Sequence, residues 1–187
     1  MRLAVLASGS GTILDAILAQ RLPVALVVVD RVCGAEDIAA SHGVRCRRVE
    51  RRSFGAGFDR DAYTAELTQV LLDDGIELIA MAGFGTILGQ PIYDHYADRV
   101  LNTHPALLPA FKGWHAVADA LAAGAEVTGC TVHVATLEVD DGPILAQEAV
   151  TVLPDDDEAS LHERIKAVER RLYPDTIRKI LERGSVA

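Results

Sequence analysis

Short apolar runs alternate with segments of helical period along the first hundred residues of the chain. The apolar runs are continuous rather than alternating with polar residues, which is typical of parallel strands buried on both faces. We predict strands at residues 3–7, 24–29, 44–49, 78–81 and 100–102. The segments between them predict helices at residues 12–19, 35–41, 59–72 and 91–96. The predicted fold class is therefore α/β, with a doubly wound, mostly parallel sheet.

The pattern changes after a proline-containing loop at residues 105–109. A helix is predicted at residues 116–123, followed by the strand-like runs "TGCTVHVAT" and "GPILAQEAVTV". Only the polar "LEVDD" joins these runs, so we expect an antiparallel pair at one side of the sheet.

The acidic segment "PDDDEAS" predicts the start of a last helix that runs to about residue 183. We expect Asp157 or Ser160 as its N-cap, with Ser160 and Glu163 forming a capping box. Negative charge near a helix N-terminus is stabilising, which favours this interpretation of the acidic run over a metal site.

Length and composition fit one domain over residues 1–187, since 50% of the residues are hydrophobic and no repeat or linker interrupts them. Three distant cysteines without a C-x-x-C pair indicate neither a disulfide framework nor a zinc site. No signal-peptide pattern and no apolar stretch of about 18 residues is present. We therefore predict a cytoplasmic location and no membrane partner.

The charge balance disfavours a nucleic-acid partner. There are 27 acidic and 18 basic residues, with a formal net charge of -9, whereas phosphate backbones require a basic surface. Small-molecule substrates are expected instead. The local exception is "RCRRVERR" at residues 45–52, which is either a solvated surface segment or a source of attraction for an anionic substrate tail.

A glycine-rich loop, "SGSGT" at residues 8–12, lies between the first predicted strand and helix. Glycines permit a tight turn with exposed N–H groups, and the helix start carries partial positive charge, so a phosphate can be held without a lysine. The spacing matches neither a P-loop nor G-x-G-x-x-G, whose third glycine position is Leu14 here. The loop is therefore either a phosphate site or a tight turn that closes a βα unit.

The stretch "LNTHPALLPAF" places Asn102 and His104 at the end of a predicted strand. Ligands bind outside the carboxyl ends of strands in such sheets, and residues i and i+2 of a strand point to the same side. The Asn102 amide can donate to a developing oxyanion, and His104 can carry a proton. The alternative for His104 is a loop histidine bonded to backbone.

Asp140, in "LEVDDGP", is the candidate group that orients the His104 ring. It lies in the connection between the two late strands, where Gly142 and Pro143 allow the chain to fold back over the strand ends. A carboxylate beside an imidazole fixes its tautomer and favours the charged form. The alternative for Asp140 is a turn residue. His133, inside an apolar run, is expected to be a bonded core histidine that supports the site.

The motifs "SGSGT", "NTHPALLPAFKG" and "GCTVHVATLEVDDGPILAQEAV" resemble those of the phosphoribosylglycinamide formyltransferase family. The resemblance covers essentially the whole chain, with the motifs in the family's order. It implies a Rossmann-like formyltransferase fold whose N-terminal half binds a ribonucleotide and whose C-terminal half carries the folate site and the catalytic loop. Val117 stands where relatives often have histidine.

The resemblance also implies the roles of individual residues. The matches to the family's catalytic residues are Asn102, His104 and Asp140. The matches to its substrate site are Ser10, Gly11, Thr12 and Ile13 for the phosphate and Glu169 for the ribose. The matches to its folate site are Arg60, Gly85, Thr86, Ile87, Leu88, Asn102, Val139 and Asp140. Ile13 replaces a usual asparagine, and Gly85-Thr86 replaces a usual Met-Arg.

The implied activity is transfer of the formyl group of 10-formyltetrahydrofolate to the amine of glycinamide ribonucleotide, in de novo purine synthesis, without a metal ion. The resemblance leaves undecided whether the chain forms a homodimer. One alternative is a related enzyme that uses the same folate, either a formyl hydrolase or a transferase with another amine acceptor. A second is a non-catalytic dinucleotide-binding module, which leaves Asn102, His104 and Asp140 without a role.

Overall fold

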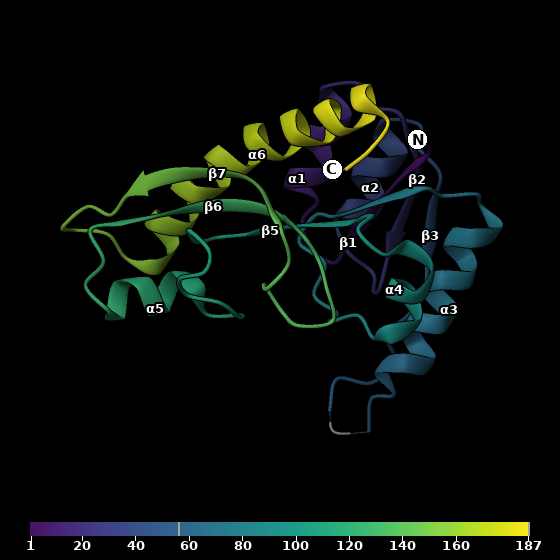
Figure 1. Ribbon diagram of the computed structural model, residues 1–187, viewed down its shortest axis with the longest axis horizontal. Helices are drawn as coiled ribbons and strands as arrows, with labels where there is room; N and C mark the ends of the chain where they lie inside the picture. The colour runs from purple at the N-terminus through teal and green to yellow at the C-terminus, as the bar shows by residue number, and fades with distance from the viewer. Residues whose placement is uncertain (56, 187) are drawn as a thin grey trace.

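The computed structural model describes residues 1–55 and 57–186, in which seven strands form one sheet with the order β3-β2-β1-β4-β5-β6-β7 (Figure 1). The strands are β1 (Leu3–Ala7), β2 (Val24–Val29), β3 (Cys46–Arg48), β4 (Leu78–Met81), β5 (Val100–His104), β6 (Val127–Val134) and β7 (Ile144–Thr151). Strands β1 to β5 pair in parallel, whereas β6 runs antiparallel to both β5 and β7.

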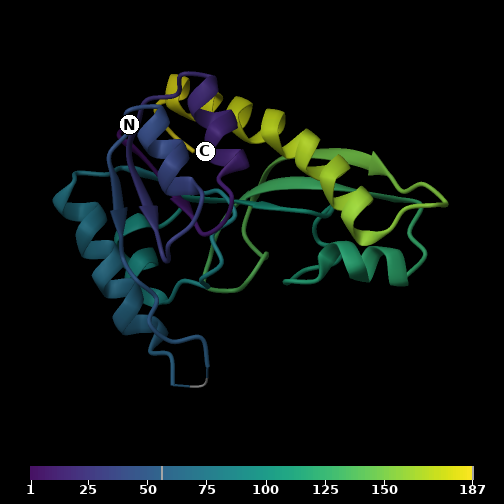
Figure 2. The same ribbon diagram turned by 180° about the vertical axis from the view of Figure 1, so that it is seen from behind.

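Helices cover both faces of the sheet (Figures 1 and 2). They are α1 (Thr12–Ala19), α2 (Ala35–Ser41), α3 (Arg60–Asp73), α4 (Gln90–Tyr96), α5 (Ala116–Ala122) and α6 (Glu158–Arg183). Buried side chains of α1, α2 and α6 share one core cluster, and those of α3 and α4 share a second. The predicted class, a doubly wound and mostly parallel sheet with one antiparallel pair, is confirmed.

Alternation along the parallel strands β1, β2, β4 and β5 divides this part of the sheet between these two cores, whereas Cys130 of β6 and Val150 of β7 belong to a third core with α5 and the start of α6. On β5, Val100 belongs to the core under α3 and α4, whereas Leu101 belongs to the core under α1 and α6. Successive side chains of a strand point to opposite faces. Asn102 and His104 therefore share the face of Val100, and Thr103 shares the face of Leu101.

Most predicted element bounds agree with the structure within one or two residues, and the differences have local causes. The strand predicted at residues 44–49 is shorter, covering Cys46–Arg48. It begins later because the Val44 N–H bonds to the Ala39 carbonyl at 2.9 Å, just after α2, rather than to a neighbouring strand. Strand β5 extends beyond the predicted residue 102, since its last residues pair with β6, with Asn102 opposite His133 and His104 opposite Thr131.

The acidic segment before α6 forms the helix start, but its cap differs from the predicted capping box. Asp157 is the N-cap, and its carboxylate accepts from the Ser160 N–H at 2.8 Å. The Ser160 hydroxyl in turn accepts from the Asp157 N–H at 3.0 Å. Ser160 is thus the third helical residue rather than the cap, and Glu163 has no part in the box.

Helix α6 is anchored to the middle of the sheet by Tyr173. This side chain is fully buried, and its hydroxyl donates to the Leu101 carbonyl of β5 at 3.0 Å. The bond ties the helix to the strand that carries Asn102 and His104. A second buried tyrosine, Tyr96, has a hydroxyl without a hydrogen-bond partner among the described residues.

These two tyrosines give a matched stability test. Tyr173→Phe removes a buried hydrogen bond and should lower the free energy of unfolding by about 1 kcal/mol. Tyr96→Phe removes a hydroxyl without a partner and should leave stability unchanged or slightly raised. Urea denaturation of both variants measures this. Equal losses would show that the hydroxyl bond to β5 contributes nothing.

Candidate functional site

The candidate catalytic residues meet at the carboxyl end of β5. Asn102 and His104 project from one face of this strand, and Asp140 reaches them from the β6–β7 connection. The Nδ1 atom of His104 lies 3.2 Å from Oδ2 of Asp140. Both residues are largely buried, with 4% of His104 and 8% of Asp140 exposed.

Asp140 is held from three sides. Besides His104, its Oδ2 accepts from the Gly113 N–H at 2.9 Å. Its Oδ1 lies 3.5 Å from Nε2 of His133 on β6. The carboxylate thus lies between two imidazoles and a backbone N–H, so that its orientation is fixed from both oxygens.

The backbone of the β6–β7 connection is shaped to bring Asp140 to this position. Asp140 has a φ of 54°, a left-handed conformation that aspartate tolerates better than most residues. Two residues later, Gly142 passes so close to the Val134 carbonyl that a Cβ atom would clash with it. The "DDG" sequence therefore does more than close a turn, because it aims a carboxylate over the strand ends.

The proline loop after β5 is fixed by two polar side chains of the antiparallel pair. The Thr131 hydroxyl donates to the Ala106 carbonyl at 2.6 Å and accepts from the Leu108 N–H at 3.1 Å. The Gln147 amide donates to the Leu108 carbonyl at 2.8 Å. These bonds hold the loop that carries Phe111 and Gly113 against the site.

Asn102 and His104 do not bond to each other, although they share a face. The Asn102 amide nitrogen lies 3.2 Å from Nε2 of His133, and Nε2 of His104 lies 2.7 Å from the Phe111 carbonyl. Asp140 and His133 connect the two residues. His133 therefore contacts both Asn102 and Asp140 directly. The Phe111 carbonyl and the Gly113 N–H are contacts that the sequence did not reveal.

The surroundings of Asp140 favour its charged form. Burial alone raises the pKa of this carboxyl, but the hydrogen bond from His133, the Gly113 N–H and the charge of the two imidazoles outweigh burial. Together they hold the pKa of Asp140 below its usual range. A charged carboxylate 3.2 Å from Nδ1 of His104 fixes the orientation of that ring.

The glycine loop closes tightly against α2. Gly11 has a φ of 80°, and a Cβ atom added there would lie 2.9 Å from the Ala35 Cα. The first bond of α1 runs from the Asp15 N–H to the Gly11 carbonyl at 2.8 Å, which leaves the N–H groups at the helix start free for another acceptor. The Ile13 side chain packs into the core, so only its backbone can face a ligand.

The remaining predicted substrate residue, Glu169, lies on α6. Its carboxylate accepts a hydrogen bond from the Thr103 hydroxyl. Burial raises the pKa of Glu169, while the Thr103 bond and the charges of Lys166 and Arg170 lower it, with a net upward shift. Glu169 is thus next to β5, but on the opposite face from Asn102 and His104.

The predicted folate-site residues differ in how far their side chains are exposed to solvent. In the segment after β4, Thr86 and Leu88 are buried, whereas Ile87 is half-exposed. The Thr86 hydroxyl donates to Asp30 at 2.8 Å, and the Gly85 N–H donates to Ser8 at 2.7 Å.

The other two predicted folate-site residues lie on separate elements. Val139 is about half exposed and directly precedes Asp140. Arg60 is exposed at the first turn of α3. These two and Ile87 offer side chains to a ligand, whereas Leu88 is core.

Two of the five arginines in the basic cluster at residues 45–52 pair with neighbouring acids. Arg45 pairs with Asp74 at 2.5 Å, and Arg48 pairs with Glu36 at 2.6 Å. Like Arg47 and Arg52, Arg51 pairs with no carboxylate among the described residues. Its guanidinium stacks on two phenylalanine rings, and its Nη1 lies 3.4 Å from the Thr86 hydroxyl.

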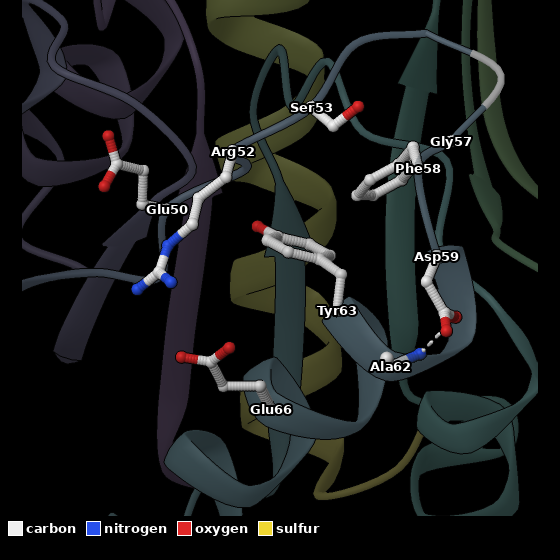
Figure 3. A pocket seen from close by; sticks show the side chains of 9 residues that line it. All are labelled: Glu50, Arg52, Ser53, Gly57, Phe58, Asp59, Ala62, Tyr63 and Glu66. Carbon is white, nitrogen blue, oxygen red and sulfur yellow. Dashed lines mark hydrogen bonds between the residues drawn. The ribbon is translucent and has the colours of Figure 1, made fainter.

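A surface pocket of about 280 Å³ lies beside this cluster, between the segment after β3 and α3 (Figure 3). Its lining residues are Glu50, Arg52, Ser53, Gly57, Phe58, Asp59, Ala62, Tyr63 and Glu66. None of the candidate catalytic residues lines it. The Tyr63 hydroxyl donates to the Val49 carbonyl at 3.2 Å, which gives this side chain a structural contact in the pocket wall.

No group of three or more His, Cys, Asp or Glu side chains among the described residues is arranged to hold a metal ion. In the same part of the chain, no helix is both long and apolar enough to cross a membrane.

The chain belongs to the formyl transferase family, whose model matches residues 1–177. Phosphoribosylglycinamide formyltransferase of Mycobacterium tuberculosis strain H37Rv is 45% identical over 188 residues, which cover 98% of this chain and 86% of that protein. The trifunctional purine biosynthetic protein adenosine-3 of Gallus gallus is 37% identical over 187 residues, covering 96% of this chain and 18% of that protein.

Solved structures show the same likeness. The crystal structure of phosphoribosylglycinamide formyltransferase from Bacillus halodurans has a TM-score of 0.89 and 36% identity, covering 99% of this chain and 97% of that one. Glycinamide ribonucleotide transformylase 1 from Symbiobacterium toebii has a TM-score of 0.88 and 40% identity, covering 95% and 86%. The predicted family and enzyme class are confirmed, while the roles of individual residues stay predictions.

The depressed pKa of Asp140 predicts how stability depends on pH. Because the folded pKa lies below the unfolded value of 3.8, the charged carboxylate stabilises the fold above that value, and the contribution is lost as pH falls through the folded pKa. Wild type should therefore exceed Asp140→Asn in stability near neutral pH, with the difference shrinking between about pH 5 and pH 2. Urea denaturation across this range measures it. A difference independent of pH would contradict the assignment.

Proposed function

We propose that the chain transfers the formyl group of 10-formyltetrahydrofolate to the amine of glycinamide ribonucleotide. The observation that carries the proposal is the convergence of Asn102, His104 and Asp140 at one strand end. It is supported by relatives that are named as this enzyme and that the chain matches over most of their length. Both substrates are small molecules, and the reaction belongs to purine synthesis.

In the reaction, the amine nitrogen attacks the formyl carbon, forming a carbon–nitrogen bond and a tetrahedral intermediate with negative charge on the formyl oxygen. Collapse of the intermediate breaks the bond between that carbon and the folate nitrogen. The proton that leaves the amine ends on the folate nitrogen, so atoms and charges balance. Holding both reactants in line removes roughly 7 to 11 kcal/mol of barrier.

Asn102 and His104 supply the donors for the oxyanion. The Asn102 amide and a protonated His104 ring each offer an N–H group, and one such donor is typically worth about 2.7 to 4 kcal/mol. In the structure the His104 Nε2 faces the Phe111 carbonyl and the Asn102 amide faces His133. Substrate therefore has to replace these contacts as it binds.

Asp140 orients the His104 ring through Nδ1 and positions a water molecule that carries the proton from the amine to the folate. The support for this role is its contact with Nδ1 of His104 and its depressed pKa. Nε2 of His133 lies 3.5 Å from the other carboxylate oxygen and 3.2 Å from the Asn102 amide nitrogen.

The ribonucleotide lies on the α1 and α6 side, with its phosphate at the N–H groups of residues 10–13 and its ribose at Glu169. The folate lies along the segment after β4, beside Ile87 and Val139. Its anionic tail is met by Arg60 and by Arg51, whose guanidinium pairs with no carboxylate among the described residues and contacts Thr86. Arg51 thus supplies charge where the family's usual arginine is replaced by Thr86.

The rival is a formyl hydrolase of the same family, which would use the same three residues with water in place of the amine. The tight glycine loop and the acidic Glu169 beside β5 favour an amine-bearing ribonucleotide over water. A cytoplasmic location and a homodimer stay expectations.

The activity is tested by a spectrophotometric transfer assay with both substrates. Wild type should form the formylated ribonucleotide, whereas His104→Ala should lose about 100- to 1000-fold in kcat with little change in ribonucleotide affinity, because one oxyanion donor is gone. His95→Ala, at an exposed position of α4, is the matched control and should retain activity. Formate release that does not require the amine would instead identify a hydrolase.

The phosphate site is tested at Gly9 rather than Gly11. A side chain at Gly11 collides with α2 and strains the backbone, so it would disturb the fold itself. A Cβ atom at Gly9 meets nothing within 4 Å, so Gly9→Leu should fold and obstruct the cradle, raising the ribonucleotide KM roughly tenfold or more. Gly55→Leu, also in open space, is the control. An unchanged KM in Gly9→Leu would place the phosphate elsewhere.

A further inference from the structure

Thr103 lies between the two candidate catalytic residues and faces away from them. Asn102 and His104 point to the side of α3 and α4, while Thr103 points with Leu101 toward α6. The neighbouring Leu101 carbonyl accepts the Tyr173 hydroxyl bond. Thr103 therefore occupies the place where the catalytic strand meets the last helix.

The Thr103 hydroxyl donates to Oε1 of Glu169. Glu169 precedes Tyr173 by four residues on α6, so both side chains lie on the helix face that contacts β5. The two bonds, from Tyr173 to Leu101 and from Thr103 to Glu169, tie the same stretch of helix to the same stretch of strand.

The second carboxylate oxygen of Glu169, Oε2, lies beside the one that Thr103 contacts. No hydrogen bond or ion pair reaches its Oε2 from any described residue. Glu169 is half-buried, and its Oε2 is not among the buried side-chain atoms that lack a partner in the described part of the chain. This oxygen is therefore open to solvent and available to a ligand, whereas Oε1 is engaged by Thr103.

The threonine hydroxyl is not explained by packing. A valine has nearly the same shape and would fill the same space on β5. What the hydroxyl adds is a directional bond that selects one orientation of the Glu169 carboxylate. In that orientation Oε1 is occupied and Oε2 is left for a partner from outside the chain.

We propose that Thr103 is a positioning residue for the ribonucleotide substrate: its hydroxyl orients Glu169 so that Oε2 accepts the ribose hydroxyls. The inference rests on the proposed function. Three consecutive residues of β5 then serve both sides of the reaction, since Asn102 and His104 face the formyl group and Thr103 fixes the group that holds the acceptor. The strand itself keeps the acceptor in register with the catalytic side chains.

The test compares Thr103→Val, Thr103→Ser and a matched control. Thr128→Val is that control, because Thr128 is a buried threonine of β6 whose hydroxyl has no partner among the described residues. Removing a hydrogen bond to a charged group should raise the ribonucleotide KM of Thr103→Val roughly 10- to 100-fold. The kcat and the folate KM should change less than about threefold, since the groups at the formyl carbon are untouched.

Thr103→Ser retains the hydroxyl and should restore the ribonucleotide KM, while Thr128→Val should leave it unchanged. Isothermal titration with glycinamide ribonucleotide gives the same comparison without turnover. An unchanged KM in Thr103→Val, or a loss that serine does not rescue, would overturn the inference while leaving the proposed function intact. If the wild-type enzyme neither bound nor formylated glycinamide ribonucleotide, the proposed function would fail and the inference with it.

Discussion

The carboxylate of Asp140 lies between the imidazoles of His104 and His133 at the carboxyl end of β5, and it accepts a bond from the Gly113 N–H. Burying a charged carboxylate is unfavourable unless several donors compensate it. One of these compensating groups, His104, also has a role in the proposed reaction. The left-handed backbone of Asp140 and the close approach at Gly142 hold the carboxylate there. Local backbone strain of this kind persists only where the surroundings over-determine it.

The sheet divides the proposed reaction between its two faces. The glycine loop and Glu169 lie on the side of α1 and α6, whereas the segment after β4 and the side chains of Asn102 and His104 serve the other side. The two sides meet at the end of β5, whose alternation sends neighbouring side chains in opposite directions. Because the parallel strands end on one edge of the sheet, side chains of the single strand β5 can lie next to both proposed substrates.

The features that could be predicted from the sequence were those that depend on short stretches of neighbouring residues. The continuous apolar runs placed the buried strands, and the motifs placed Asn102, His104 and Asp140 in one site. What depended on long-range pairing was not predictable in this way. The extra length of β5 comes from its pairing with β6, and the contact of His133 with Asp140 comes from that same register. The Thr103 bond to Glu169 joins residues 66 positions apart, which no local pattern reveals.

The central claim is that Asp140 acts through His104, and a double-mutant cycle on kcat/KM measures it most directly. The cycle compares His104→Ala, Asp140→Asn and the double variant, with glycinamide ribonucleotide and formyl folate as substrates. The account predicts strong non-additivity, with the double variant little worse than His104→Ala alone, because residues that act as a unit lose the same stabilisation once. Losses that simply add would show that the two side chains work independently and would contradict the account.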